Sequence, residues 1–289
     1  MKPIKYISIL LLIILSSCKK EVNEKLTATE PQIVVNAFIS PSNDSIRVQL
    51  DYSKSYFNES KNRDELVKNI SLANVIINDG ISDKKLIWSR INRHFHISKK
   101  DLPILANRKY TLRINTVDGK VASAETIVPT SITDFDLIIT ATYNKKNDRY
   151  NKINMNLKDE KGVENYYRFA LFNQIIYKNP NFPINEQFVK IDIKFFTDNK
   201  DQLENIFLLS EASLQESSNN GSQTKIETYL RGYFEKGDEA YYKYLTTVEQ
   251  NSESGSNPFV EPTSVFTNIK GGLGVFSSYQ RVEKTIRSN

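Results

Sequence analysis

The chain has 289 residues, a formal net charge of +5 and a single cysteine. This length allows one large domain or two ordinary domains, each with its own core. One cysteine excludes an internal disulfide framework, and the modest charge gives little reason to expect nucleic acid as a partner. Fifteen Phe and fifteen Tyr residues favour a β-rich fold.

The first eighteen residues, MKPIKYISILLLIILSSC, have the pattern of an export signal. Lys2 and Lys5 precede an apolar run, and small residues stand just before Cys18. A secretory signal combines a basic start, an apolar core of about 7–15 residues and a small-residue cleavage site. The run is shorter than the roughly 20 residues that span a membrane. Residues 1–17 are therefore predicted to be a signal peptide that is removed on export.

The sequence Leu-Ser-Ser-Cys is typical of a lipoprotein signal, in which the thiol of Cys18 becomes the lipid attachment point. The alternative is an ordinary secretory signal that ends in Cys by chance. Lipidation, with palmitate among the acyl chains, would anchor the mature chain stably, because each buried methylene contributes about 0.8 kcal/mol. Lys19 rather than Asp follows the cysteine, which favours the outer membrane. The periplasmic face and the cell surface both stay open.

Residues 18–31 are polar after the cysteine and are predicted to be a lipidated tether. Beyond them, short alternating runs separated by turn residues predict an immunoglobulin- or fibronectin-like β-sandwich over residues 32–129. Asp118-Gly119 between two strand-like runs predicts a hairpin, because the tight turn needs positive φ. The strands expected here are 33–40, 45–51, 74–79, 85–89, 95–98, 110–116 and 121–128.

Residues 130–289 are predicted to form a second, β-rich domain with one amphipathic helix at about 239–250. Asp238 is a suitable N-cap, and Tyr241, Tyr244, Leu245 and Val248 recur at helical spacing. The polar segment 215–224 predicts an exposed loop, and the chain is expected to end in a hairpin that turns at Gly271-Gly272. The strands expected in this half are 133–144, 152–159, 166–177, 188–196 and 224–234.

Four features in order resemble the Bacteroidota lipoproteins of domain of unknown function 4249. They are the lipoprotein signal at Cys18, the strand IVVNAFIS, the hairpin YTLRINTVDGKVASAETIVP and the closing segment NPFVEPTSVFTNIKGGLGVFSSYQ. The last is the most specific, although Ser277 stands where the family often has Gly. The resemblance covers the mature chain. It implies an outer-membrane protein frequently encoded beside TonB-dependent receptors, and it supplies no catalytic residues.

The two histidines, His94 and His96, would point to the same face of a strand and could donate two metal ligands. Asp101 and Glu125 are the candidates for a third ligand. A pair of solvent-facing or cross-strand histidines is the favoured interpretation, so no metal site is predicted. The sequence carries none of the common hydrolase, metalloprotease or nucleotide motifs. We therefore expect no enzyme, no cofactor and no catalytic residue.

Trp88 is a candidate ligand position, since an aromatic platform can stack on a sugar, but a lone Trp on an alternating strand is more often core. Gly271, Gly272 and Gly274 are candidate turn or ligand positions, with a turn or bulge favoured. The expected function is that of a non-catalytic, lipid-anchored outer-membrane accessory protein, a partner of a TonB-dependent β-barrel receptor. The alternatives are a surface module that captures a glycan or peptide, and an enzyme with an unfamiliar carboxylate site.

Overall fold

The computed structural model describes residues 30–54, 63–132, 134–143, 149–159, 162–198, 205–212, 224–254 and 264–287. The predicted signal peptide, Cys18 and the tether up to residue 29 lie outside these ranges, as does nearly all of the expected loop 215–224. Residues Pro31–Ser53 and Lys61–Asn289 group into one compact unit.

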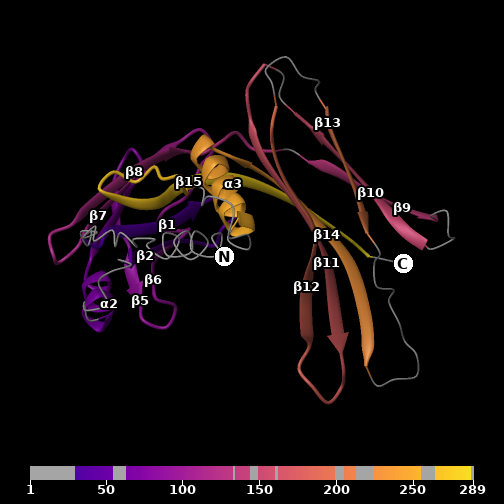
Figure 1. Cartoon of the computed structure of the whole chain (residues 1–289), viewed down its shortest axis with the longest axis horizontal. Coiled ribbons are helices and arrows are strands. Elements are labelled where there is room, and N and C mark those ends of the chain that lie inside the picture. Colours follow the sequence, from indigo (N-terminus) through magenta and orange to yellow (C-terminus); the bar gives the residue numbers. More distant parts are fainter. Residues whose placement is uncertain are drawn as a thin grey trace, which may run out of the picture. The chain divides into compact units, whose positions relative to one another are not determined.

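The chain is mainly β, as its sequence predicts (Figure 1). In the first half, alternation of buried and exposed side chains marks strands with one face in a core. In β2, for example, Arg47 is exposed, Val48 is buried and Gln49 is exposed again. The strands of this half are β1 (Ile33–Ile39), β2 (Ser45–Tyr52), β3 (Asn74–Asn78), β4 (Asp83–Lys85), β5 (Ile87–Ser89), β6 (His94–Ser98), β7 (Lys109–Asn115) and β8 (Val121–Ile127).

These strands belong to two sheets that share one core. One sheet has the order β4-β3-β7-β8, and the other carries β1, β2, β6 and β5 next to one another. Fully buried side chains from both sheets, among them Val35, Val48 and Leu112, join in a single hydrophobic cluster. The arrangement is a β-sandwich, and Ile269 and Phe276 of the C-terminal segment belong to the same core. The predicted hairpin is confirmed: β7 and β8 pair antiparallel, and Gly119 has φ of +82°.

The second half adds longer strands and a second core. Strands β9, β10 and β13 form a three-stranded sheet, while β12, β11, β14 and β15 extend the sheet that contains β1. The two sheets bury a cluster that includes Met155, Phe169 and Phe234. The strands are β9 (Phe135–Tyr143), β10 (Arg149–Lys158), β11 (Tyr166–Lys178), β12 (Asn185–Thr197), β13 (Asn205–Ala212), β14 (Lys225–Gly237) and β15 (Gly272–Arg287).

Strand β15 connects the two halves of the eight-stranded sheet. Its first seven residues pair in parallel with β1, and residues from Tyr279 onward pair antiparallel with β14 (Figure 1). The expected terminal hairpin at Gly271-Gly272 is therefore wrong, because the described residues 264–269 form no strand and the segment continues as one strand of 16 residues. The segment forms one strand because it pairs along the edge of β1 that β2 leaves free, a partner that is distant in the sequence.

Within the described residues, two helices accompany the sheets. The predicted helix is α3 (Glu239–Ser254), and Asp238 caps it by accepting a 2.7 Å hydrogen bond from the backbone N–H of Tyr241. The other helix, α2 (Arg63–Ser71), was not predicted from the sequence, and neither was β13. Within the residues that the structure describes, no helix combines the length and the apolar character needed to cross a membrane.

Candidate functional site

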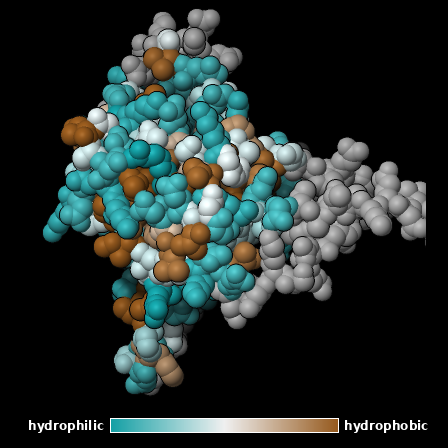
Figure 2. Space-filling view, turned by 90° about the vertical axis from the view of Figure 1, so that its left-hand side faces the viewer, coloured by the Kyte–Doolittle hydropathy of each residue, from teal (hydrophilic) through white to brown (hydrophobic). Residues whose placement is uncertain are grey.

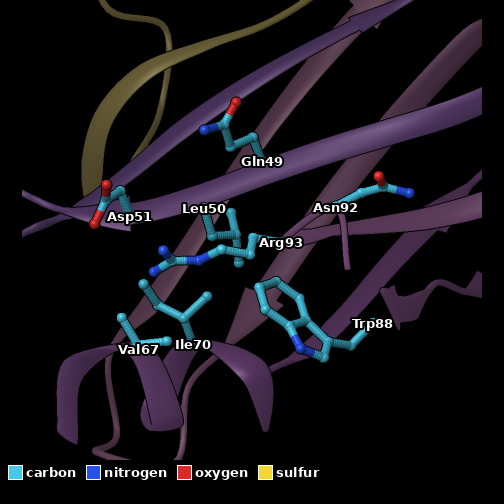
Figure 3. Close-up of a pocket in the computed structure, with 8 residues that line it drawn as sticks. All are labelled: Gln49, Leu50, Asp51, Val67, Ile70, Trp88, Asn92 and Arg93. Carbon is cyan, nitrogen blue, oxygen red and sulfur yellow. The ribbon is translucent and has the colours of Figure 1, made fainter. Parts of the chain in front are cut away.

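A pocket of about 310 Å³ lies between α2, the end of β2 and the β5–β6 turn (Figure 3). The apolar part of its lining comes from Leu50, Val67, Ile70 and Trp88, and the polar part from Gln49, Asp51, Asn92 and Arg93. Small-ligand sites are concave and mostly apolar, with a few placed polar groups, whereas half of the residues that line this concave pocket are polar. The pocket is the candidate functional site because it brings Trp88 and Arg93 together.

The β5–β6 turn places two of the lining residues. The backbone N–H of Arg93 donates to the carbonyl of Ser89 at 2.8 Å, and the N–H of Asn92 donates to the Ser89 hydroxyl at 3.3 Å. Arg93 has φ of +53°, a left-handed conformation that is uncommon outside glycine. Backbone strain of this kind is often associated with functional positions. Here it lets the turn close while the Arg93 side chain extends into the pocket.

Figure 3 shows the Arg93 side chain running between Leu50 and the α2 residues Val67 and Ile70, with the Trp88 indole beside it. Its aliphatic stem thus covers apolar surface, and the guanidinium lies on the side of the pocket where Val67 and Asp51 are found. No ion pair engages Arg93 within the described part of the chain. A planar guanidinium is suited to bind a carboxylate in bidentate geometry.

The side chain of Trp88 belongs both to the core and to the pocket. It is half-buried, packs against the N-terminal hydrophobic cluster and lies 5.0 Å from Phe95 between ring centroids. Its exposed part lines the pocket. The two interpretations of the sequence, core residue and ligand position, are therefore compatible, because the half-buried indole packs against the core and also lines the pocket.

The three candidate glycines lie away from this pocket and contact the chain's own backbone. A Cβ built on Gly271, Gly272 or Gly274 would approach the carbonyl oxygens of Val121, Ile33 and Val35 to 2.2, 2.6 and 2.0 Å, respectively. The glycines thus permit β15 to enter beside β1 and β8. Asn268 supports the same segment, since its side chain donates to the carbonyl of Phe276 at 2.8 Å and accepts from the Phe276 N–H at 3.0 Å.

The two histidines form a close pair, and the described residues add no third metal ligand to it. The rings of His94 and His96 lie 5.9 Å apart in an edge-to-face arrangement. Glu125, a candidate third ligand, forms an ion pair with Lys109 at 2.6 Å. In the described ranges, no group of three or more His, Cys, Asp or Glu side chains could hold a metal ion.

The structure also contains a buried ionic cluster that sequence reasoning missed. Glu235 is 1% exposed at its side chain and accepts hydrogen bonds from Arg168 at 2.7 Å, from Arg281 and from the hydroxyl of Tyr241 in α3. Burial by itself would lower the pKa of Arg168, but the charge of the Glu235 carboxylate has the larger effect, so the pKa of Arg168 is raised. These residues come from three strands and one helix, so no local pattern could reveal the cluster.

Among the described residues, the carboxyl groups of Asp238 and Asp198 have raised pKa values. Burial raises the pKa of Asp238 to about 6, although the Thr126 hydroxyl and the Tyr241 N–H lower it by hydrogen bonding. Burial, with the adjacent Asp159, also raises the pKa of Asp198 to about 6. Both groups are engaged in internal contacts: Asp238 caps α3, and Asp198 accepts from the side chain of Asn165 at 3.2 Å. They lie outside the pocket.

The comparison with protein families gives one result. A family model described as Domain of unknown function (DUF4249) matches residues 19–285. No curated protein matches the chain. The match includes the sandwich, the pocket and the closing segment with its three glycines. Because it covers nearly the whole sequence, the chain belongs to the family of the Domain of unknown function DUF4249.

Proposed function

We propose that this chain is a non-catalytic, lipid-anchored protein of the outer membrane, of the kind found in Bacteroidota, that captures a carboxylate-bearing glycan or peptide. The pocket carries the proposal. The guanidinium of Arg93, which has no ion-pair partner among the described residues, would bind the carboxylate, and Trp88 would stack on the body of the ligand. Asn92 and Gln49 also line the pocket; Figure 3 shows the Gln49 amide on the other side of β2 from Leu50, so Arg93 and Trp88 are the residues that would contact the ligand. Acylated Cys18, which precedes the described residues, would hold this site at the membrane.

The single tryptophan provides a direct test. Acidic oligosaccharides and acidic peptides are titrated into the purified protein while Trp88 fluorescence is recorded. We expect saturable changes with one of these classes and not with its neutral counterpart. Replacing Arg93 with Gln should weaken binding by about tenfold or more, because a charge-assisted bidentate contact is lost.

Arg90→Gln is the matched control, since Arg90 is exposed in the same turn but does not line the pocket. Its affinity should equal that of the unchanged protein. Equal losses in the two variants, or no fluorescence change with any acidic ligand, would contradict capture at this site.

A second candidate function is partnership with a TonB-dependent β-barrel receptor. The observation that favours it is a pair of exposed apolar residues on the outer face of the three-stranded sheet, Phe207 and Leu209 of β13 at 70% and 51% exposure. Ile138 of β9, at 56% exposure, lies on the same face beyond Asn154 of β10. By contrast, hydrophobic side chains on the face seen in Figure 2 emerge in scattered groups among hydrophilic ones. Grouped exposed apolar residues are typical of protein contacts.

Recovery of a β-barrel receptor with tagged protein from outer membranes tests this partnership. Phe207→Asn should reduce the recovery, whereas Ile91→Asn should not, because Ile91, with 93% exposure, lies in the β5–β6 turn and belongs to no strand of the three-stranded sheet. Failure to recover any receptor with the unchanged protein would count against the partnership.

A further inference from the structure

Strand β12 forms one edge of the eight-stranded sheet, with β11 as its neighbour (Figure 1). The C-terminal half of β12 contacts β13. Lys194 Nζ donates to the carbonyl of Leu209 at 2.7 Å, and the Ser210 hydroxyl donates to the Asp192 carboxylate. Residues 185–190, the N-terminal half of β12, are all exposed, whereas the next six residues of the strand are half-buried. No strand among the described residues pairs with their outer edge.

Exposed apolar side chains accompany this open edge. Phe188 and Val189 are 48% and 49% exposed and point to opposite faces of the sheet. Phe182 and Ile184 in the preceding turn are 70% and 67% exposed. Proteins usually protect a long edge strand, since its free N–H and C=O groups are a template for pairing. An edge that is both long and apolar is therefore suited to receive another strand.

The sequence of this edge is complementary to itself. In an antiparallel pair centred on Phe188, the two Phe188 side chains face each other. Glu186 of each copy then lies opposite Lys190 of the other copy. Residues 186, 188 and 190 share one face, so two ion pairs would flank a pair of aromatic rings. In the single chain, Lys190 has no ion-pair partner within the described residues, and Glu186 contacts the amide of Gln174.

We propose that residues 185–190 of β12 bind the same residues of a second copy of this chain, antiparallel about Phe188. The eight-stranded sheets of the two copies then form one continuous sheet. The pairing uses backbone hydrogen bonds for affinity and the Glu186–Lys190 pairs for register. It involves no residue of the pocket, so it stands independently of the proposed function.

A cysteine scan across this edge tests the register. Phe188→Cys places two thiols directly opposite each other, at the Cα separation of about 4.5–5.5 Å that antiparallel pairs have and that a disulfide accepts. Mild oxidation of outer membranes that carry this variant should give a covalent dimer on a non-reducing gel. Gln187→Cys, which lies opposite Val189 of the other copy, is the matched control and should cross-link far less. The unchanged chain controls for Cys18.

Charge exchange tests the same pairing in the purified full chain. Glu186→Lys or Lys190→Glu should raise the dimer dissociation constant by about tenfold or more, since two attractive contacts become repulsive. The double variant should restore affinity to about the original value. Both side chains are exposed, so the variants should fold normally. Melting temperatures equal to that of the unchanged chain would confirm this. A monomer throughout the micromolar range, equal cross-linking at positions 187 and 188, or no rescue by the double variant would overturn the proposal.

Discussion

The carbonyl oxygen of Val35 in β1 stands where a side chain at Gly274 in β15 would begin, since a Cβ at position 274 would approach it to 2.0 Å. The two residues are directly paired in the parallel register that joins the C-terminal strand to the first strand. Gly274 also has φ of +97°. Backbone conformation and space therefore both require glycine at this position.

Replacing Gly274 with Ala should consequently lower the free energy of unfolding by about 3 kcal/mol or more, because left-handed strain adds to a backbone collision. Gly119→Ala is the matched control: φ is +82° there, but nothing lies within 4 Å of the added Cβ. It should cost about 1–2 kcal/mol. Urea denaturation followed by Trp88 fluorescence measures both values. Equal losses would show that the close approach of β15 to β1 is unimportant for stability.

Glu235 is expected to contribute strongly to the stability of the contact between α3 and the sheet. Glu235→Gln leaves Arg168 and Arg281 close together without the carboxylate that neutralises them. Loss of one partner from a buried ion pair typically costs about 3–5 kcal/mol. Glu239→Gln is the control, because Glu239 forms an exposed pair with Lys243 and its loss should cost less than about 1 kcal/mol. Similar midpoints of denaturation for the two variants would contradict this role.

Asp238 should make stability depend on pH. Its pKa is raised from 3.8 to about 6 by burial, so the folded chain holds the proton more tightly than the unfolded chain. The resulting stabilisation is full below about pH 4 and is lost as the pH rises through about 6. Between about pH 4 and pH 8, the ionisation of Asp238 should therefore lower the free energy of unfolding by about 2 kcal/mol.

Asp238→Asn keeps an N-cap acceptor for α3 and removes this titration. The difference in unfolding free energy between pH 4 and pH 8 should therefore be smaller in the variant by about 2 kcal/mol. Asp198, whose pKa is also raised, is present in both proteins and cancels in the comparison. An unchanged pH dependence would show that Asp238 does not carry this effect.

Cys18→Ser is predicted to release the chain from the membrane. Without the thiol, the signal cannot receive diacylglycerol, and the anchoring of the acyl chains is lost. Metabolic labelling with a palmitate analogue and fractionation of cells measure the change: the unchanged chain should be labelled and sediment with membranes, and the variant should do neither. Labelling of the Ser variant would place the lipid elsewhere.

Local features were predicted well from the sequence. The β7–β8 hairpin follows from Asp118-Gly119, since a tight turn with positive φ needs few residues and no distant partner. The helix α3 follows in the same way from its cap and apolar spacing. Strand β13 was missed, although Ile206, Phe207, Leu208 and Leu209 are strongly apolar. Helix α2 was missed because its pattern is short and mostly polar.

The candidate site could be predicted only in part. Trp88 was identified because it is the single tryptophan on an alternating strand. Arg93 and the α2 wall were not, since the pocket forms only when β2, α2 and the β5–β6 turn come together. The glycines of the closing segment were recognised as a motif, but their role needed the position of β1.

By itself, the sequence determined the mainly β class, the hairpin and the capped helix, because alternation, turn residues and caps act over a few residues. It also predicts an export signal that ends at Cys18. The tertiary structure decided the parallel pairing of β15 with β1, the pocket around Arg93 and the burial of Glu235 between two arginines. Each of these joins residues distant in the chain, and such contacts depend on which edge or surface the folded core leaves open.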